Sequence, residues 1–140
     1  ERNEIGDEKF DVILLGDVLE HMAYPDAVLV GLKKFLKLEG KFVISLPNIA
    51  HYSIRLQLLL GKWETTDSGT LDRTHVRFYT LAAAQKMIEH CGLRIDKIRP
   101  SSGYIERFGL TKLKQIGKRA LFFWPKLLAV QFIYVAKLTA

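Results

Sequence analysis

Short apolar runs alternate along the chain with longer segments in which apolar residues recur at helical spacing. Four runs have the length of β-strands: KFDVILLG at 9–16, KFVISLPN at 41–48, LRIDKIR at 93–99 and AVQFIYVAK at 129–137. The first two lack a polar alternation, which is typical of strands buried on both faces of a sheet. The last is also apolar on both faces, so we predict that it lies in the middle of the sheet rather than at an edge.

Three segments have the pattern of amphipathic helices. In the first, PDAVLVGLKKFLKLEG at 25–40, Pro25 suits a first helical turn and Gly40 suits a helix stop. The second is AHYSIRLQLLLG at 50–61. In the third, Thr80 can cap a helix whose apolar stripe runs to Cys91 and ends at Gly92.

Residues 62–79, KWETTDSGTLDRTHVRFY, show no clean period and are rich in Thr, Asp and Gly. A loop of this length inside a compact domain is usually functional or mobile. The order of the elements predicts an α/β fold, with a mainly parallel sheet and helices on both of its faces. Residues 100–125 are basic and aromatic, and we predict that they form an insertion before the last strand.

The composition is that of one folded domain. The 140 residues are 49% hydrophobic and 26% charged, which excludes a disordered chain. The single cysteine, Cys91, excludes an internal disulfide framework and fits a reducing compartment, so we predict a cytoplasmic protein with a buried thiol. We expect no signal peptide, because the first ten residues are polar and acidic. Pro125, Lys126 and Gln131 interrupt the most apolar stretch, which is therefore too short to span a membrane.

Positive charge is concentrated in one late segment. The net charge is +6, and four basic residues follow one another with no acid between them: Lys112, Lys114, Lys118 and Arg119. They form either a solvated face or a contact with an anionic partner. Basic and apolar residues alternate at helical spacing over 101–126, so this segment either packs on the sheet or makes a peripheral membrane contact. We expect no nucleic-acid partner, because no recognition motif is present.

Titratable side chains follow the first predicted strand directly. Gly16 ends that strand, and Asp17, Glu20 and His21 occupy three of the next five positions. In parallel α/β sheets, ligands bind beyond the carboxyl ends of the strands. A packed core has no use for three titratable groups, so this stretch predicts a binding or catalytic site.

Two longer stretches carry a family resemblance: VILLGDVLEHMAYPDAVLVGLKKFLKLEGKFVISLPN at 12–48 and GTLDRTHVRFYTLAAAQKMIEHCGL at 69–93. Together they resemble the second half of a class I S-adenosylmethionine-dependent methyltransferase of the small-molecule type. The resemblance covers residues 9–99 closely and the last strand more loosely. It implies a Rossmann-like methyltransferase fold with an antiparallel last strand, S-adenosyl-L-methionine as cofactor, and methyl transfer to a small-molecule, sugar or lipid-linked acceptor.

One part of the family pattern is missing. The family holds its cofactor with a Gly-rich loop after the first strand, where only glycine lets the main chain approach so closely. This sequence contains no G-x-G cluster. We therefore predict that residues 1–140 form the C-terminal part of one methyltransferase domain and are inactive alone, as a fragment or as a truncated homologue. The alternative function is a non-catalytic half-domain that acts as a binding module.

The resemblance implies cofactor contacts for the residues that end the first strand: Gly16, Asp17, Val18 and Leu19. For Asp17, a cap on the following turn is the alternative. Glu20 and His21 can orient each other, with His21 as general base for a hydroxyl, unless His21 only braces the cleft. His75, in the loop predicted to cover the cleft, is the second candidate base.

Substrate contacts are predicted for Asn48, which follows the second strand, and for Arg73 and Arg77, which flank His75 and suit an anionic substrate. The alternative for the arginines and His75 is a loop held together by its own polar contacts. The LPN step at 46–48 is not the motif of adenine amino-group methylation, which favours an oxygen acceptor.

A divalent metal is a further alternative at this site. Two acids and two histidines would suit such an ion: Asp17, Glu20, His21 and His75. The pattern is short, and from the sequence we assign no metal ligand.

Overall fold

The computed structural model describes residues 6, 8–102, 121 and 123–139. These residues form four strands: β1 (Phe10–Gly16), β2 (Leu36–Pro47), β3 (Leu93–Ser101) and β4 (Gln131–Leu138). They also form helices α1 (Pro25–Leu32), α2 (Tyr52–Leu59), α3 (Leu81–His90) and α5 (Pro125–Leu128), and the 3₁₀ turns η1 (Leu19–His21) and η2 (Lys33–Phe35). The basic residues at 112–119, and most of the segment 101–126 for which we predicted a membrane contact, lie outside the described residues.

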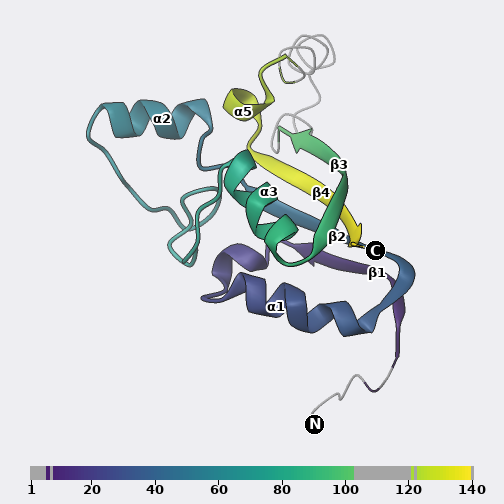
Figure 1. Ribbon diagram of the computed structural model, residues 1–140. Coiled ribbons are helices and arrows are strands. Elements are labelled where there is room, and N and C mark those ends of the chain that lie inside the picture. The colour runs from purple at the N-terminus through teal and green to yellow at the C-terminus, as the bar shows by residue number, and fades with distance from the viewer. Residues whose placement is uncertain (1–5, 7, 103–120, 122, 140) are drawn as a thin grey trace, which may run out of the picture.

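The strands form one mixed sheet in the order β1-β2-β4-β3 (Figure 1). β1 and β2 are parallel, and β4 is antiparallel to both of its neighbours, β2 and β3. Three strands therefore run in one direction and the last strand runs in the other, which confirms the predicted fold class. The position of β4 between β2 and β3 confirms that it is central.

The core lies on one face of this sheet. Leu15, Ile44 and Tyr134 are paired across β1, β2 and β4, and all three are buried. α1 and α3 contribute Leu29 and Ile88 to the same cluster, and neither residue is exposed. Burial of such side chains stabilises the fold by about 1.5–3 kcal/mol each. The core on this face of the sheet holds β1 and β2 beside each other, so that their carboxyl ends meet.

The opposite face of the sheet differs from the prediction. We expected β1 to be buried on both faces and helices to cover both faces of the sheet. Instead Val12 and Leu14, which alternate with the core residues of β1, are 46% and 69% exposed. β1 is an edge strand of the described sheet, and α1 and α3 pack together on the core face. The apolar pattern of β1 predicted that helices pack on this second face as well, but no described residues cover Val12 and Leu14 there.

The first helix is shorter than predicted. We expected it to run to Gly40, but α1 ends at Leu32 and Leu36 already pairs with Phe10 in the sheet. The register between β1 and β2 then shifts before Val12. A Cβ at Gly40 would lie 2.8 Å from the Leu36 side chain, so Gly40 permits a close approach within β2 rather than ending a helix.

α3 begins and ends as predicted, and α2 lies within the predicted segment 50–61. Thr80 caps α3, because its Oγ1 accepts a hydrogen bond of 3.2 Å from the amide of Ala83. Cys91 follows α3 and is only 4% exposed, which confirms the buried thiol, and burial raises its pKa. No helix in the described part of the chain is long and apolar enough to cross a membrane.

The cap of α2 makes one pH dependence testable. Nδ1 of His51, the N-cap residue, accepts from the Ser53 amide at 3.4 Å, and burial lowers the pKa of His51. As the pH falls, His51 therefore becomes protonated in the unfolded chain before it does so in the folded protein. The free energy of unfolding then decreases as the pH falls below about 6.5. His51→Asn keeps a cap that does not titrate, so we expect the loss of unfolding free energy between pH 7.5 and 5 to shrink by up to about 1 kcal/mol.

Urea denaturation at the two pH values measures this difference. The control is His90→Asn, which changes an exposed histidine at the end of α3. An equal pH dependence in wild type and His51→Asn would show that His51 does not lower stability at acid pH.

Candidate active site

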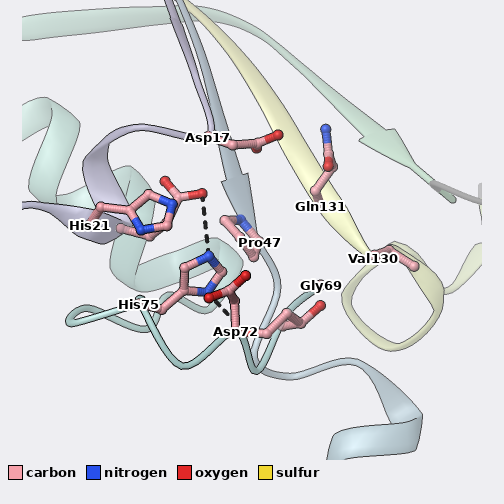
Figure 2. Close-up of a pocket in the computed structure, with 10 residues that line it drawn as sticks. Asp17, His21, Pro47, Gly69, Asp72, His75, Val130 and Gln131 are labelled. Atoms are coloured by element: carbon pink, nitrogen blue, oxygen red, sulfur yellow. Dashed lines mark hydrogen bonds and ion pairs between the residues drawn. The ribbon is translucent and has the colours of Figure 1, made fainter. Parts of the chain in front are cut away.

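A cavity of about 410 Å³ lies at the carboxyl ends of β1 and β2 (Figure 2). Its lining comes from the turn after β1, from the loop at 62–79 and from the start of β4. The residues are Asp17, Glu20, His21, Pro47, Gly69, Thr70, Asp72, His75, Val130 and Gln131. Of the ten residues predicted to form the site, the cavity thus brings together four: Asp17, Glu20, His21 and His75.

Two main-chain hydrogen bonds hold the loop over η1. The amides of Val76 and Arg77 donate to the carbonyl oxygen of Glu20 at 2.9 and 3.0 Å. The Arg77 side chain adds a bond of 2.6 Å to the carbonyl oxygen of Ala23. These contacts confirm the expectation that the loop covers the cleft, and they bring His75 beside His21.

His21 is oriented by Thr74 and Asp72. The Thr74 hydroxyl donates to Oδ1 of Asp72 at 2.6 Å, so its single proton is used. Nδ1 of His21 lies 3.1 Å from that hydroxyl oxygen and 3.2 Å from the Thr74 carbonyl oxygen, and both oxygens can only accept from it. Nδ1 therefore carries the proton of the neutral ring, and Nε2 keeps a free lone pair.

His75 has the same arrangement on the other side. Its Nδ1 lies 3.2 Å from the carbonyl oxygen of Thr70, which requires Nδ1 to be the donor. Its Nε2 then faces Glu20, 4.0 Å from Oε1 (Figure 2). The rings of His21 and His75 stand edge to face with centroids 4.7 Å apart. Both imidazole rings therefore lie beside the Glu20 carboxylate.

Glu20 is the least usual member of the group. The residue is 1% exposed, and neither carboxylate oxygen has a hydrogen-bond partner among the described residues. Burial raises the pKa of Glu20, because the charged form loses its hydration. Buried carboxylates are normally paired, and leaving one without a partner costs about 1–3 kcal/mol or more.

Asp17 borders the cavity but is held apart from this group. It has a φ of 51°, in the left-handed region, and its Oδ1 accepts from the Ser45 hydroxyl at 2.6 Å. The Ser45 oxygen in turn accepts from the Asp17 amide at 3.0 Å. Asp17 therefore joins the ends of β1 and β2, a contact that the sequence did not indicate.

The other predicted cofactor residues lie outside the cavity lining. Gly16 is exposed at the end of β1, and Val18 is half-buried. Leu19 is fully buried, so its side chain belongs to the core rather than to a ligand site.

The three predicted substrate residues have partners within the protein. Asn48 is 1% exposed, and its Nδ2 donates to the carbonyl oxygens of Ala129 and Lys126 at 2.8 and 3.1 Å. Arg73 pairs with Asp67, and Arg77 holds Ala23 as described above. Both arginines thus make the structural polar contacts that we considered as the alternative to substrate binding.

We did not predict from the sequence that Asp72 and Thr74 belong to the site, although the pattern D-x-T is typical of a local turn held by the Asp side chain. Asp72 accepts from both the amide and the hydroxyl of Thr74, at 2.8 and 2.6 Å, as Asp does in a local turn. These bonds lower the pKa of Asp72 and keep it ionised. The cavity therefore has a negatively charged wall.

Three of the four residues considered for a metal lie close enough to share an ion. One ligand atom each from Glu20, His21 and His75 lies within 4.8 Å of the other two. Asp17 is not part of this group.

One family model matches more than half of the chain. Residues 3–98 match the family model described as "Methyltransferase domain". A search of curated proteins finds no match. Many solved structures share the fold.

Among those structures, a SAM-dependent methyltransferase from Archaeoglobus fulgidus is 16% identical, with a TM-score of 0.56 over 94% of this chain and 60% of that chain. Magnesium protoporphyrin IX methyltransferase from Synechocystis, with bound SAH, is 14% identical, with a TM-score of 0.57 over 97% of this chain and 48% of that one. The [4+2]-cyclase SpnF is 15% identical, with a TM-score of 0.56 over 98% of this chain and 53% of that one. The chain thus spans about half to three-fifths of these proteins.

The site geometry predicts the tautomer of both histidines. We expect His21 and His75 to carry their neutral-ring proton on Nδ1, because oxygen acceptors face that atom in both residues. Long-range ¹⁵N–¹H correlation spectra at pH 8 report the protonated nitrogen directly. Thr74→Val removes one acceptor from His21 alone, so its preference should weaken while that of His75 stays unchanged. A proton on Nε2 in wild-type protein would contradict the arrangement.

Proposed function

The chain belongs to the methyltransferase-domain family, and from that membership we propose that the protein transfers a methyl group from S-adenosyl-L-methionine to an oxygen atom of a small-molecule acceptor. The single observation that carries the choice of oxygen is the convergence of His21, His75 and Glu20 on one cavity. The shared fold alone does not decide the reaction, since SpnF, with the same fold, is described as a cyclase.

The end of β1 fits one flank of the cofactor. A Cβ added to Gly16 would meet no atom within 4 Å, so the main chain there is open to a ligand. Beside it, the bonds to Ser45 fix the carboxylate of Asp17 at the rim of the cavity. The cofactor supplies a methyl group already activated by a sulfonium. The chain has no G-x-G cluster, so its own residues provide contacts on this flank only.

The protein's task is then to align the acceptor and to remove its proton. A hydroxyl is a weak acid and needs a nearby base, which the Nε2 atom of His21 or His75 supplies. The buried Glu20 carboxylate, 4.0 Å from Nε2 of His75, stabilises the imidazolium that forms there. An amine acceptor with a free lone pair would not require this pair of bases.

The charge of the cavity favours a neutral acceptor. Asp17, Glu20 and Asp72 all belong to its lining, and no Lys or Arg of the described residues does. An anionic reacting group would be repelled by these carboxylates. For this reason we do not assign Arg73 and Arg77 to substrate binding, and the acceptor is better described as a neutral hydroxyl compound.

Substitution of the two histidines tests this function in the protein at its full natural length. We expect His21→Ala and His75→Ala to lower turnover by about 10²–10⁴, the usual contribution of a positioned base, with little change in cofactor affinity. Turnover is measured as transfer of a labelled methyl group, with positional analysis of the product. His90→Ala, on the exposed end of α3, is the control.

Two results would contradict the proposal. A labelled methyl group on nitrogen or carbon would exclude the oxygen acceptor. Wild-type turnover in both histidine variants would remove the site from the reaction.

A further inference from the structure

Glu20 needs a partner that the described residues do not supply. Its carboxylate is buried, both oxygens lack a hydrogen bond, and the nearest cationic candidate, Nε2 of His75, stands 4.0 Å away. That separation is too long for a hydrogen bond. A buried polar group without a partner calls for a specific explanation, and a bound ion is one of them.

The two histidines are arranged as metal ligands are. A histidine that binds a metal through one ring nitrogen almost always donates its other N–H to a carbonyl or carboxylate oxygen, which fixes the ring and the tautomer. His21 and His75 make these bonds through Nδ1 to the carbonyl oxygens of Thr74 and Thr70. In the neutral rings the Nε2 atoms are then unprotonated, and Nε2 of His75 faces Glu20.

The three ligand atoms can bind one ion if their side chains move slightly closer together. They lie within 4.8 Å of one another. Metal–nitrogen and metal–oxygen bonds of about 2.0–2.2 Å bring neighbouring ligands to roughly 3–3.5 Å. His21 is exposed and lies on a short turn, so its side chain can move by this amount without disturbing the core.

We propose that Glu20, His21 and His75 together bind one divalent transition-metal ion. Two imidazoles with one carboxylate suit manganese, iron, cobalt or zinc, whereas calcium and magnesium prefer oxygen ligands throughout. The negative wall formed by Asp17 and Asp72 adds an attraction for a dication. Three protein ligands leave further coordination positions open toward the cavity.

The ion changes how the acceptor is activated. A hydroxyl that coordinates a dication has a lowered pKa, so its proton can pass to solvent at the exposed side of the site, where His21 lies. With the ion bound, this activation replaces the base role given to the histidines above: they position the ion, and methyl transfer to oxygen remains the proposed reaction. This role rests on the proposed function, whereas binding of the ion rests on the geometry alone.

Metal binding is measured on the protein after removal of metals with a chelator and dialysis. Titration with manganese chloride, followed by calorimetry and by the loss of the free-ion electron paramagnetic resonance signal, should give one ion per chain. We expect Glu20→Gln, His75→Ala and His21→Ala each to weaken binding at least tenfold. The matched controls are Glu89→Gln and His90→Ala, on the exposed end of α3, which should leave affinity unchanged.

His21→Ala keeps the test decisive if a change at the buried Glu20 prevents folding, because His21 is exposed. Absence of saturable binding, or equal affinity in wild type and His21→Ala, overturns the inference. Cobalt in place of manganese adds a second readout, since its visible spectrum should change on binding to wild type and not to the variants.

An activity arm separates this inference from the proposed function. Stoichiometric metal binding without methyl transfer supports the ion site and contradicts the proposed function. Full methyl transfer by metal-free protein in chelator contradicts the role of the ion in the reaction and leaves the proposed function standing. Loss of transfer in chelator, with recovery on added manganese, supports both.

Discussion

The site depends on one contact between segments that are more than fifty residues apart. The carbonyl oxygen of Glu20 accepts hydrogen bonds from the amides of Val76 and Arg77, and these bonds fix the loop across the turn after β1. The same contact places His75 against Glu20 and closes Glu20 off from water. Without it, the carboxylate would be hydrated and the two histidines would not share a cavity.

The burial of Glu20 lowers the stability of the fold but gives the site a carboxylate that can bind or react. Folding covers a carboxylate that no described residue hydrogen-bonds, while core side chains on the other side of η1, such as Leu19, hold the turn in place. Such a conflict between local stability and geometry is typical of functional sites. A proton, a protonated His75 or a bound dication can each relieve the cost. Only the dication also uses the nitrogen lone pairs that the neutral rings of both histidines offer, which is why we propose it.

Part of this was accessible from the sequence. The apolar runs predicted all four strands, because short runs rich in β-branched and other apolar residues are typical of strands, and the apolar pattern of β4 predicted its central place. Asp17, Glu20, His21 and His75 were identified because titratable groups follow a strand end or lie in the covering loop. The end of α1 was not predicted, because an apolar residue such as Leu36 fits the pattern of a helix and that of a strand equally well. Only its pairing with Phe10 in the sheet decides between the two. The structural partners of Asn48, Arg73 and Arg77 were not predicted, because a polar residue near a site looks the same in the sequence whether it faces a ligand or a main-chain carbonyl.

The central claim is that Glu20, His21 and His75 converge on one ion that handles the acceptor oxygen. Anomalous diffraction from crystals of the protein grown with manganese tests it most directly. The account predicts a single strong peak in the cavity, about 2.0–2.3 Å from Nε2 of each histidine and from a carboxylate oxygen of Glu20. A map with no peak there, and with Glu20 still lacking any partner, would contradict it.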